Sequence, residues 1–425
     1  MNLIKEVKSD RLGESYFEVQ HAAGLKIMIY PKPENHSTYA IFGTNYGSID
    51  NTFRRSDEGE AATVPNGIAH YLEHKMFESE DGDAFARYAK TGASANAYTS
   101  FDKTCYLFSC AAKVYDSLEI LLDFVQHPYF TEKTVQKEQG IIGQEIRMYD
   151  DDPTWRVLFN MLGGMYHNHP VKIDIAGTVE SIAQITPELL YRCYHTFYNL
   201  NNMALCVVGN VEENRVLELC DRMLKPSADV RVERIFQPEP ETIVQPRICA
   251  KGSVVTPLFY YGFKEKATHQ PTDQQEAATE ILLEMLFGES SPLFRRLLDS
   301  ALINEASFSY EYFNGPGYAC VLFSGESKNP DAVAQAICGE AEKARREGLD
   351  PAAFARAQKA VYGRIISSCN SVETIANTMI GASFAGRSLY GMIDAVAQAT
   401  CEQVEARLQE QMLPDRAVLS IIEPD

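Results

Sequence analysis

Three residues in the segment 67–77 have the types and the spacing of a metal site with a base beside it. His70 and His74 are four residues apart, so on a helix both imidazoles lie on one face and can reach the same cation at about 2.0–2.1 Å. Glu73 lies on the adjacent strip, where its carboxylate can accept a proton from a water molecule that the cation activates. The order His-x-x-Glu-His defines the inverzincin pattern of zinc hydrolases. The segment therefore indicates a hydrolytic zinc site.

The residues around this motif favour a helix. Pro65 and Asn66 suit a helix start, and Ile68, Leu72 and Met76 form an apolar line at i, i+4 spacing on another face. An ordinary polar helix face also contains residues of the same types, so the motif by itself leaves both interpretations open. A third ligand would decide between them.

A second predicted helix, further along the chain, offers carboxylates for that role. Glu138 and Glu145 are seven residues apart, so two helical turns bring them to the same side, about 10 Å apart along the axis. One carboxylate can bind the metal while the other orients a ligand or the substrate. A solvated Glu/Lys face is the alternative interpretation. The apolar positions that predict the helix are Val135, Ile142 and Ile146.

Together these residues resemble the M16 (pitrilysin/insulinase) family of zinc peptidases, in which His-x-x-Glu-His is followed by two glutamates seven residues apart. Here Glu145 lies 71 residues after His74, which matches the family spacing. The resemblance implies one zinc ion per chain, held by His70, His74 and Glu145. It also implies that Glu73 is the general base and Glu138 a supporting catalytic carboxylate.

The segment 92–106 resembles the stretch of the family that follows the metal helix and pairs with an extended peptide substrate. An exposed sheet edge binds a peptide through main-chain hydrogen bonds, with little dependence on the peptide sequence. The residues alone suit an internal strand equally well. The resemblance favours the edge, and it implies that Asn96, Ala97, Tyr98 and Thr99 contact the substrate.

Length and composition exclude several classes of protein. At 425 residues the chain is too long for one hydrophobic core, so two or more domains are expected. The sequence contains no run of about 18 apolar residues and its first residues lack the apolar core of a signal peptide, so we expect a cytoplasmic protein without a membrane partner. The formal net charge of −19 opposes binding to nucleic acid. The 10 scattered cysteines, without a Cys-x-x-Cys pair, indicate buried thiols in a reducing compartment.

The order of predicted elements indicates an α+β protein made of two related α/β sandwich domains, each an antiparallel-rich sheet packed with helices. Residues 1–224 form the predicted catalytic domain, 225–255 a proline-containing linker, and 256–425 a second domain without metal ligands. An offset of 211 residues places Ile281–Met285 on His70–His74, so the second copy keeps the helix and loses the histidines. The predicted strands are 26–30, 39–42, 203–208, 259–263, 306–310 and 318–323, and the predicted helices include 118–126, 211–223, 273–287, 331–347 and 351–367.

The second half also departs from the M16 pattern. Active members often carry an arginine and, seven residues later, a tyrosine that contact the bound peptide. Leu298 and Glu305 stand at these positions here, unless Arg295, Arg296 or Tyr310 substitutes. The chain therefore resembles the zinc-bearing subunit of bacterial heterodimeric M16 peptidases, whose sister subunit supplies the Arg/Tyr pair. A homodimer that completes its own sites is the alternative.

Two other functions are compatible with the residues. The M16 family includes non-catalytic subunits of larger assemblies, and sulfur-ribosyl lyases with a small-molecule substrate also use His-x-x-Glu-His. Manganese and cobalt are alternatives to zinc, because affinity alone does not select the metal. His167 and His169 do not share a helical face, so we expect loop residues there and not a second metal site.

Overall fold

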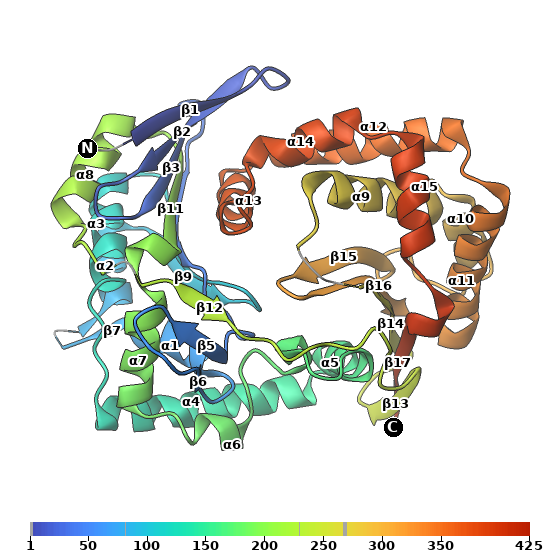
Figure 1. Cartoon of the computed structure of the whole chain (residues 1–425), viewed down its shortest axis with the longest axis horizontal. Helices are drawn as coiled ribbons and strands as arrows, with labels where there is room; N and C mark the ends of the chain where they lie inside the picture. Colours follow the sequence, from blue (N-terminus) through green and yellow to red (C-terminus); the bar gives the residue numbers. More distant parts are fainter. Residues whose placement is uncertain (1–2, 81, 229, 267–269) are drawn as a thin grey trace. The chain divides into compact units, whose positions relative to one another are not determined.

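The chain folds into two units, each built on a β-sheet, and both units draw segments from both halves of the chain (Figure 1). The computed structural model describes residues 3–80, 82–228, 230–266 and 270–425. The first unit comprises Met1–Ile146, Asp174–Ile235 and Ser368–Leu389, and the second comprises Arg147–Ile173, Phe236–Ser367 and Tyr390–Asp425. The domain boundaries predicted at 224 and 256 stay predictions. The two units do not follow these boundaries throughout. The second unit includes residues 147–173 from the first half of the sequence, and the first unit includes residues 368–389 from the second half.

The first unit contains a seven-stranded sheet in the order β1-β2-β3-β11-β4-β10-β9. The pair β3 and β11 is parallel, and the other neighbours are antiparallel. The two central strands, β4 and β11, are buried at every residue, as continuous apolar runs predict. The strands are β1 Leu3–Ser9, β2 Glu14–Gln20, β3 Lys26–Pro31, β4 Thr38–Thr44, β9 Ser94–Thr99, β10 Thr104–Cys110 and β11 Met203–Gly209.

Helices cover both faces of this sheet. The helices α1 and α3 pack on the face of β4, β9 and β10, whereas α13 packs on β4 and β11 from the other side (Figure 1). Small strands β5 Thr52–Arg55, β6 Ala62–Thr63 and β12 Val232–Arg234 form a separate sheet, and β7 Glu78–Ser79 pairs with β8 Gly82–Asp83. The helices are α1 Ile68–Met76, α2 Ala84–Thr91, α3 Val114–Phe124, α4 Glu132–Asp151, α6 Val179–Ile182, α7 Pro187–Phe197, α8 Glu213–Met223 and α13 Val372–Phe384.

The second unit contains a five-stranded sheet in the order β13-β17-β14-β16-β15. Its helices pack around an apolar core, and more than half of the residues of α9 belong to this core. The strands are β13 Arg247–Gly252, β14 Leu258–Lys264, β15 Ser309–Gly315, β16 Tyr318–Glu326 and β17 Ala417–Pro424. The helices are α5 Pro153–Met165, α9 Asp273–Phe287, α10 Pro292–Asp299, α11 Pro330–Glu347, α12 Pro351–Ser368, α14 Leu389–Gln398 and α15 Cys401–Glu410.

The two sheets have the same topology, which confirms the predicted fold class of two related halves. The order β13-β17-β14-β16-β15 repeats β3-β11-β4-β10-β9, and in both sheets only the first pair is parallel. Helix α9 is the first helix after β14, as α1 is the first helix after β4. Ile281 and Met285 therefore occupy the place that the histidines occupy in the first half, as the offset of 211 residues predicts.

Most predicted elements agree with the structure, and three differ from it. Helix α1 begins at Ile68, with Gly67 as its N-cap, because the Asn66 side chain accepts a hydrogen bond from Asn51 and does not cap the helix. The strand predicted at 306–310 begins at Ser309. The predicted linker contains β12 and β13. These strands are held by pairing with the distant strands β5 and β17, and pairing of this kind gives no local signal in the sequence. Within the described ranges, no helix is both long and apolar enough to cross a membrane.

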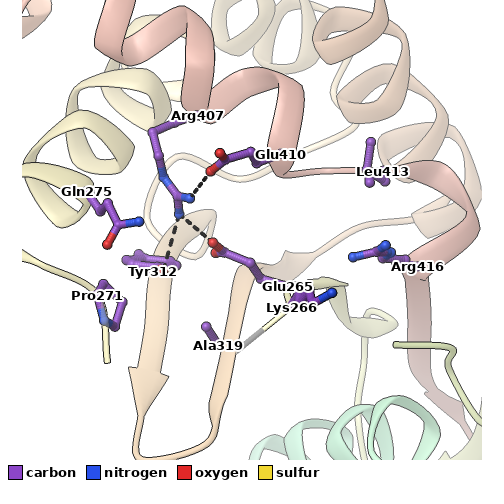
Figure 2. A pocket seen from close by; sticks show the side chains of 10 residues that line it. All are labelled: Glu265, Lys266, Pro271, Gln275, Tyr312, Ala319, Arg407, Glu410, Leu413 and Arg416. Carbon is purple, nitrogen blue, oxygen red and sulfur yellow. Dashed lines mark hydrogen bonds and ion pairs between the residues drawn. The ribbon is translucent and has the colours of Figure 1, made fainter. Parts of the chain in front are cut away.

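A buried ion network ties α15 to the sheet of the second unit. Arg407 binds Glu265 and Glu410, each at 2.7 Å, and its Nε donates to Thr279 Oγ1 at 3.1 Å. Figure 2 shows Arg407 with Glu265 and Glu410 on the wall of a cavity of about 390 Å³. The Arg407 side chain is only 5% exposed, so water cannot replace its partners. The network therefore holds the C-terminal helix in place.

We expect Arg407→Ala to destabilise the second unit by about 3–5 kcal/mol, because the substitution leaves the carboxylate of Glu265 buried without its cation. The measurement is urea unfolding followed by circular dichroism. Arg295→Ala is the control, because the exposed Arg295–Asp299 pair contributes about 0.5 kcal/mol or less. Equal losses in the two variants would contradict the structural role of the network.

Candidate metal centre

Helix α1 is fixed at both its start and its buried face. Gly67 has φ 86°, a conformation that favours glycine, and a Cβ at this position would lie 2.3 Å from the carbonyl oxygen of Ala176. Ile68, Leu72 and Met76 are buried, as their spacing predicts. The start of the helix therefore packs directly on the backbone before α6, and the orientation of the following histidines is set by the core.

The structure brings His70, His74 and Glu145 together. Glu145 Oε1 lies 3.7 Å from His70 Nε2, and Glu145 Oε2 lies 3.4 Å from His74 Nε2. Bonds of 2.0–2.1 Å in a tetrahedral zinc site separate neighbouring ligand atoms by about 3.3 Å. Among the described residues, these three form the one group whose ligand atoms are close enough to hold a metal ion. Two imidazoles and one carboxylate are also a donor set that zinc accepts in hydrolases, so the residues fit the metal.

Glu138 lies on the far side of His74 and not among the ligand atoms. Its Oε1 is 3.0 Å from His74 Nδ1. A proton on Nδ1 satisfies this contact and leaves the lone pair of Nε2 for a metal. Burial opposes the charge of His74, but the hydrogen bond to Glu138 and the nearby carboxylates outweigh it and raise the pKa of His74. The two glutamates thus have different positions: Glu145 faces both imidazoles, and Glu138 orients one of them.

His70 is the more enclosed imidazole. Its pKa is lowered to about 4, first by burial and then by the neighbouring His74. Its Nδ1 is buried and has no hydrogen-bond partner among the described residues. A neutral imidazole is the form that binds a metal. Burial therefore favours the protonation state of His70 that a metal ligand requires.

Glu73 is buried beside the ligands and is held by the end of β9. The hydroxyl of Thr99 donates to Glu73 Oε2 at 2.8 Å. Burial raises the pKa of Glu73, and the bond from Thr99 only partly offsets this effect. A carboxylate with a raised pKa is a stronger base than an exposed one. Glu73 thus lies beside the group of His70, His74 and Glu145 and is not part of it, and its role as the base stays a prediction.

The four predicted substrate-binding residues lie on β9, which is an edge strand of its sheet. Asn96 and Ala97 line a cavity beside the site, whereas the Tyr98 hydroxyl faces the other side of the sheet and donates to Asn377 Oδ1 at 2.9 Å. The side chain of Thr99 binds Glu73. The strand thus offers its outer backbone edge, and its four side chains point in different directions.

Sequence reasoning missed the apolar wall of that cavity, which measures about 530 Å³. Phe77 and Phe85 line it, with stacked rings whose centroids are 4.4 Å apart. Glu78, Glu80 and Asp83 add carboxylates to its lining. Phe77 lies three residues after His74, so its position could have been noticed. Phe85 reaches the site only because α2 folds back, for which the sequence has no local signal.

The residues at the expected Arg/Tyr positions do not form a substitute pair within the second unit. Leu298 packs against the apolar core, and Glu305 is exposed. The three alternatives are engaged: Arg295 with Asp299, Arg296 with Glu340, and Tyr310 with Glu284.

His167 and His169 lie in a loop of the second unit, as predicted. The Nε2 of His169 is 2.9 Å from the Pro316 carbonyl oxygen, and its Nδ1 accepts from the Val171 N–H at 3.1 Å. Both ring nitrogens of His169 are therefore used within the protein, and the loop is not a second metal site.

Comparison with known proteins agrees with this geometry. A family model described as “Insulinase (Peptidase family M16)” matches residues 60–179, and one described as “Peptidase M16 inactive domain” matches residues 184–361. The chain is 40% identical to the “Uncharacterized zinc protease YmfH” of Bacillus subtilis, over 99% of this chain and 100% of that protein. It is similar to the crystal structure of a putative M16-like peptidase from Alicyclobacillus acidocaldarius, with 35% identity, a TM-score of 0.90 and coverage of 100% of this chain and 99% of that chain. A protease from Helicobacter pylori shares the fold at 20% identity, with a TM-score of 0.79 over 100% of both chains.

The fold and the site thus define a peptidase-type chain with two related halves, of which the first carries the ligand cluster. The chain belongs to the M16 peptidase family. Its relatives are named as zinc proteases.

We expect Glu138→Ala to weaken zinc binding by about 10- to 100-fold, because His74 loses the carboxylate that fixes its tautomer and ring orientation. Competition with a chromophoric chelator measures the affinity. Gln136→Ala, on an exposed position of the same helix, is the matched control. Unchanged affinity in Glu138→Ala would show that His74 is oriented by other contacts.

Proposed function

We propose that the chain is a zinc-dependent endopeptidase that cleaves unstructured peptides. The observation that carries the proposal is the convergence of His70, His74 and Glu145 beside a buried, non-ligating carboxylate at the end of an edge strand. A metal site alone would be compatible with many reactions. The base and the open strand edge beside it favour hydrolysis of an extended peptide over that of a small molecule.

His70, His74 and Glu145 would hold the zinc ion. When bound, zinc would polarise the carbonyl of the scissile peptide bond and make a nearby water more acidic. Glu73 accepts the proton of the attacking water and later donates it to the leaving amine. Burial supports this role, because it raises the pKa of Glu73 and so makes its carboxylate a better proton acceptor.

The outer edge of β9 would pair with the peptide backbone. Main-chain pairing places the peptide along a strand whose last residue touches the base, so the scissile bond lies close to Glu73. The cavity lined by Phe77 and Phe85 would receive one side chain of the peptide. Apolar rings within a carboxylate-rich wall suit a long side chain with an apolar stem, including one with a cationic end.

The complete enzyme would be a clamshell dimer in which a sister M16 subunit supplies the missing Arg/Tyr pair. Leu298 and Glu305 support this proposal, because neither side chain can hydrogen-bond a substrate carbonyl as arginine and tyrosine do. A homodimer is the alternative assembly, and a non-catalytic subunit of a larger assembly is the alternative function.

We expect Glu73→Gln to bind one zinc ion per chain and to lose about 10²- to 10⁴-fold in turnover, because glutamine cannot accept the proton. His70→Ala is expected to lose the metal itself. Metal content by plasma emission spectroscopy, and hydrolysis of internally quenched peptides by the cleavage-competent assembly, alone or with a partner, measure the two effects. His36→Ala is the control, because His36 is exposed and outside the site. Full activity of Glu73→Gln, or stoichiometric zinc in His70→Ala, would contradict the assigned roles.

We expect the purified chain alone to carry one zinc ion and to show no turnover of a mixture of quenched peptides, because its peptide clamp is incomplete. Addition of a sister M16 subunit is expected to restore cleavage. The blank is the same mixture with Glu73→Gln. Turnover by the lone chain that is absent from the blank would show that the site is complete without a partner.

A further inference from the structure

We infer that Thr99 is a positioning residue, whose hydroxyl holds the carboxylate of Glu73 in the one orientation from which it can act as the base. The inference rests on the proposed function. Thr99 ends β9, and its hydroxyl donates to Glu73 Oε2 at 2.8 Å. One carboxylate oxygen, Oε2, is thereby engaged, which restricts the rotation of the carboxylate.

The direction of this hydrogen bond follows from the neighbouring hydroxyl. Thr99 Oγ1 also lies 3.4 Å from Thr104 Oγ1, and a threonine has only one hydroxyl proton to donate. Thr104 is fully buried and donates its own proton to the carbonyl oxygen of Tyr46 at 2.9 Å. The proton of Thr99 therefore goes to the nearer and charged acceptor, Glu73.

The second half of the chain contains the same contact without a metal site. Tyr310 on β15 donates to Glu284 Oε2 at 2.9 Å, and the two residues are 26 positions apart, as are Glu73 and Thr99. In the first half the contact joins α1 to the edge strand β9, and in the second half it joins α9 to the edge strand β15. The fold thus places an edge-strand hydroxyl against this glutamate in both halves.

The two halves differ in what else binds the carboxylate. In the second half the guanidinium of Arg364 also donates to Glu284 Oε2, at 2.9 Å, so that carboxylate is fixed by an ion pair. Among the described residues, Glu73 forms no ion pair with an arginine or a lysine, and the positive charge that acts on it is that of His74. Burial disfavours its charge, and the hydroxyl and backbone N–H of Thr99 are the groups that favour the ionised form through hydrogen bonds. Loss of the Thr99 hydroxyl therefore leaves Glu73 without its side-chain donor.

The test compares Thr99→Val, which keeps the shape and removes the hydroxyl, with Thr99→Ser, which keeps the hydroxyl. In the cleavage-competent assembly, alone or with a partner, Thr99→Val is expected to retain zinc and KM and to lose about 10- to 100-fold in kcat. Thr99→Ser is expected to restore kcat to within a few-fold of the unmodified chain. Thr44→Val is the control, because it removes a buried hydroxyl bonded to the Phe197 carbonyl oxygen without touching Glu73.

A second readout needs neither metal nor turnover. The infrared carboxylate band of Glu73 in the metal-free chain is identified as the band that disappears in Glu73→Gln. We expect this band to shift in Thr99→Val and to keep its position in Thr99→Ser. An unshifted band with unchanged kcat in Thr99→Val would overturn the inference, as would Thr99→Ser behaving like Thr99→Val. Absence of cleavage by the unmodified assembly would instead overturn the proposed function, while the infrared comparison would still decide the role of Thr99.

Discussion

The repulsion among carboxylates packed between α1 and α4 is the constraint on which the site depends. Glu138 and Glu145 approach the same imidazole, and their side chains are only 13% and 24% exposed. Ionised groups at such depth cost several kcal/mol each unless an opposite charge compensates them. His74, whose pKa is raised, compensates in part, whereas burial keeps His70 neutral. A divalent cation would satisfy the remaining charge, which supports the proposed metal site between α1 and α4.

The second unit meets the same problem with a different cation. Its helix α9 keeps a buried glutamate, Glu284, at the place of Glu73, but apolar residues stand where the histidines would be. Arg364 binds Glu284 and supplies the positive charge from within the chain. Both halves therefore retain a carboxylate between a helix and an edge strand. Glu73 lies beside the group of residues that could hold a metal ion, whereas Glu284 is paired with the guanidinium of Arg364.

Much of this arrangement could be predicted from the sequence, because helical spacing determines which side chains share a face. The shared face of His70 and His74 follows from their interval of four residues. The approach of Glu145, and not Glu138, to both imidazoles was implied only by the resemblance to the M16 pattern. The roles of Thr99 and Phe85 could not be predicted. Thr99 reaches Glu73 through the pleat of an edge strand, and Phe85 through the packing of α2, and neither relation leaves a periodic signal. The strands β12 and β13 were hidden for a similar reason, since they pair with distant partners within a proline-containing segment.

The exchange of helices between the two halves also determines when the first unit can finish folding during synthesis. Helix α13, which packs on β4 and β11 of the first sheet, belongs to residues 372–384, so almost the whole chain must leave the ribosome before the first unit can be finished. Domains usually fold as units, the N-terminal one first, while the rest of the chain is still being synthesised. Here the face of the sheet that α13 covers lacks this helix until residues 372–384 have been translated. A nascent chain cut short before α13 would therefore carry the His-x-x-Glu-His motif beside a sheet that lacks one of its covering helices.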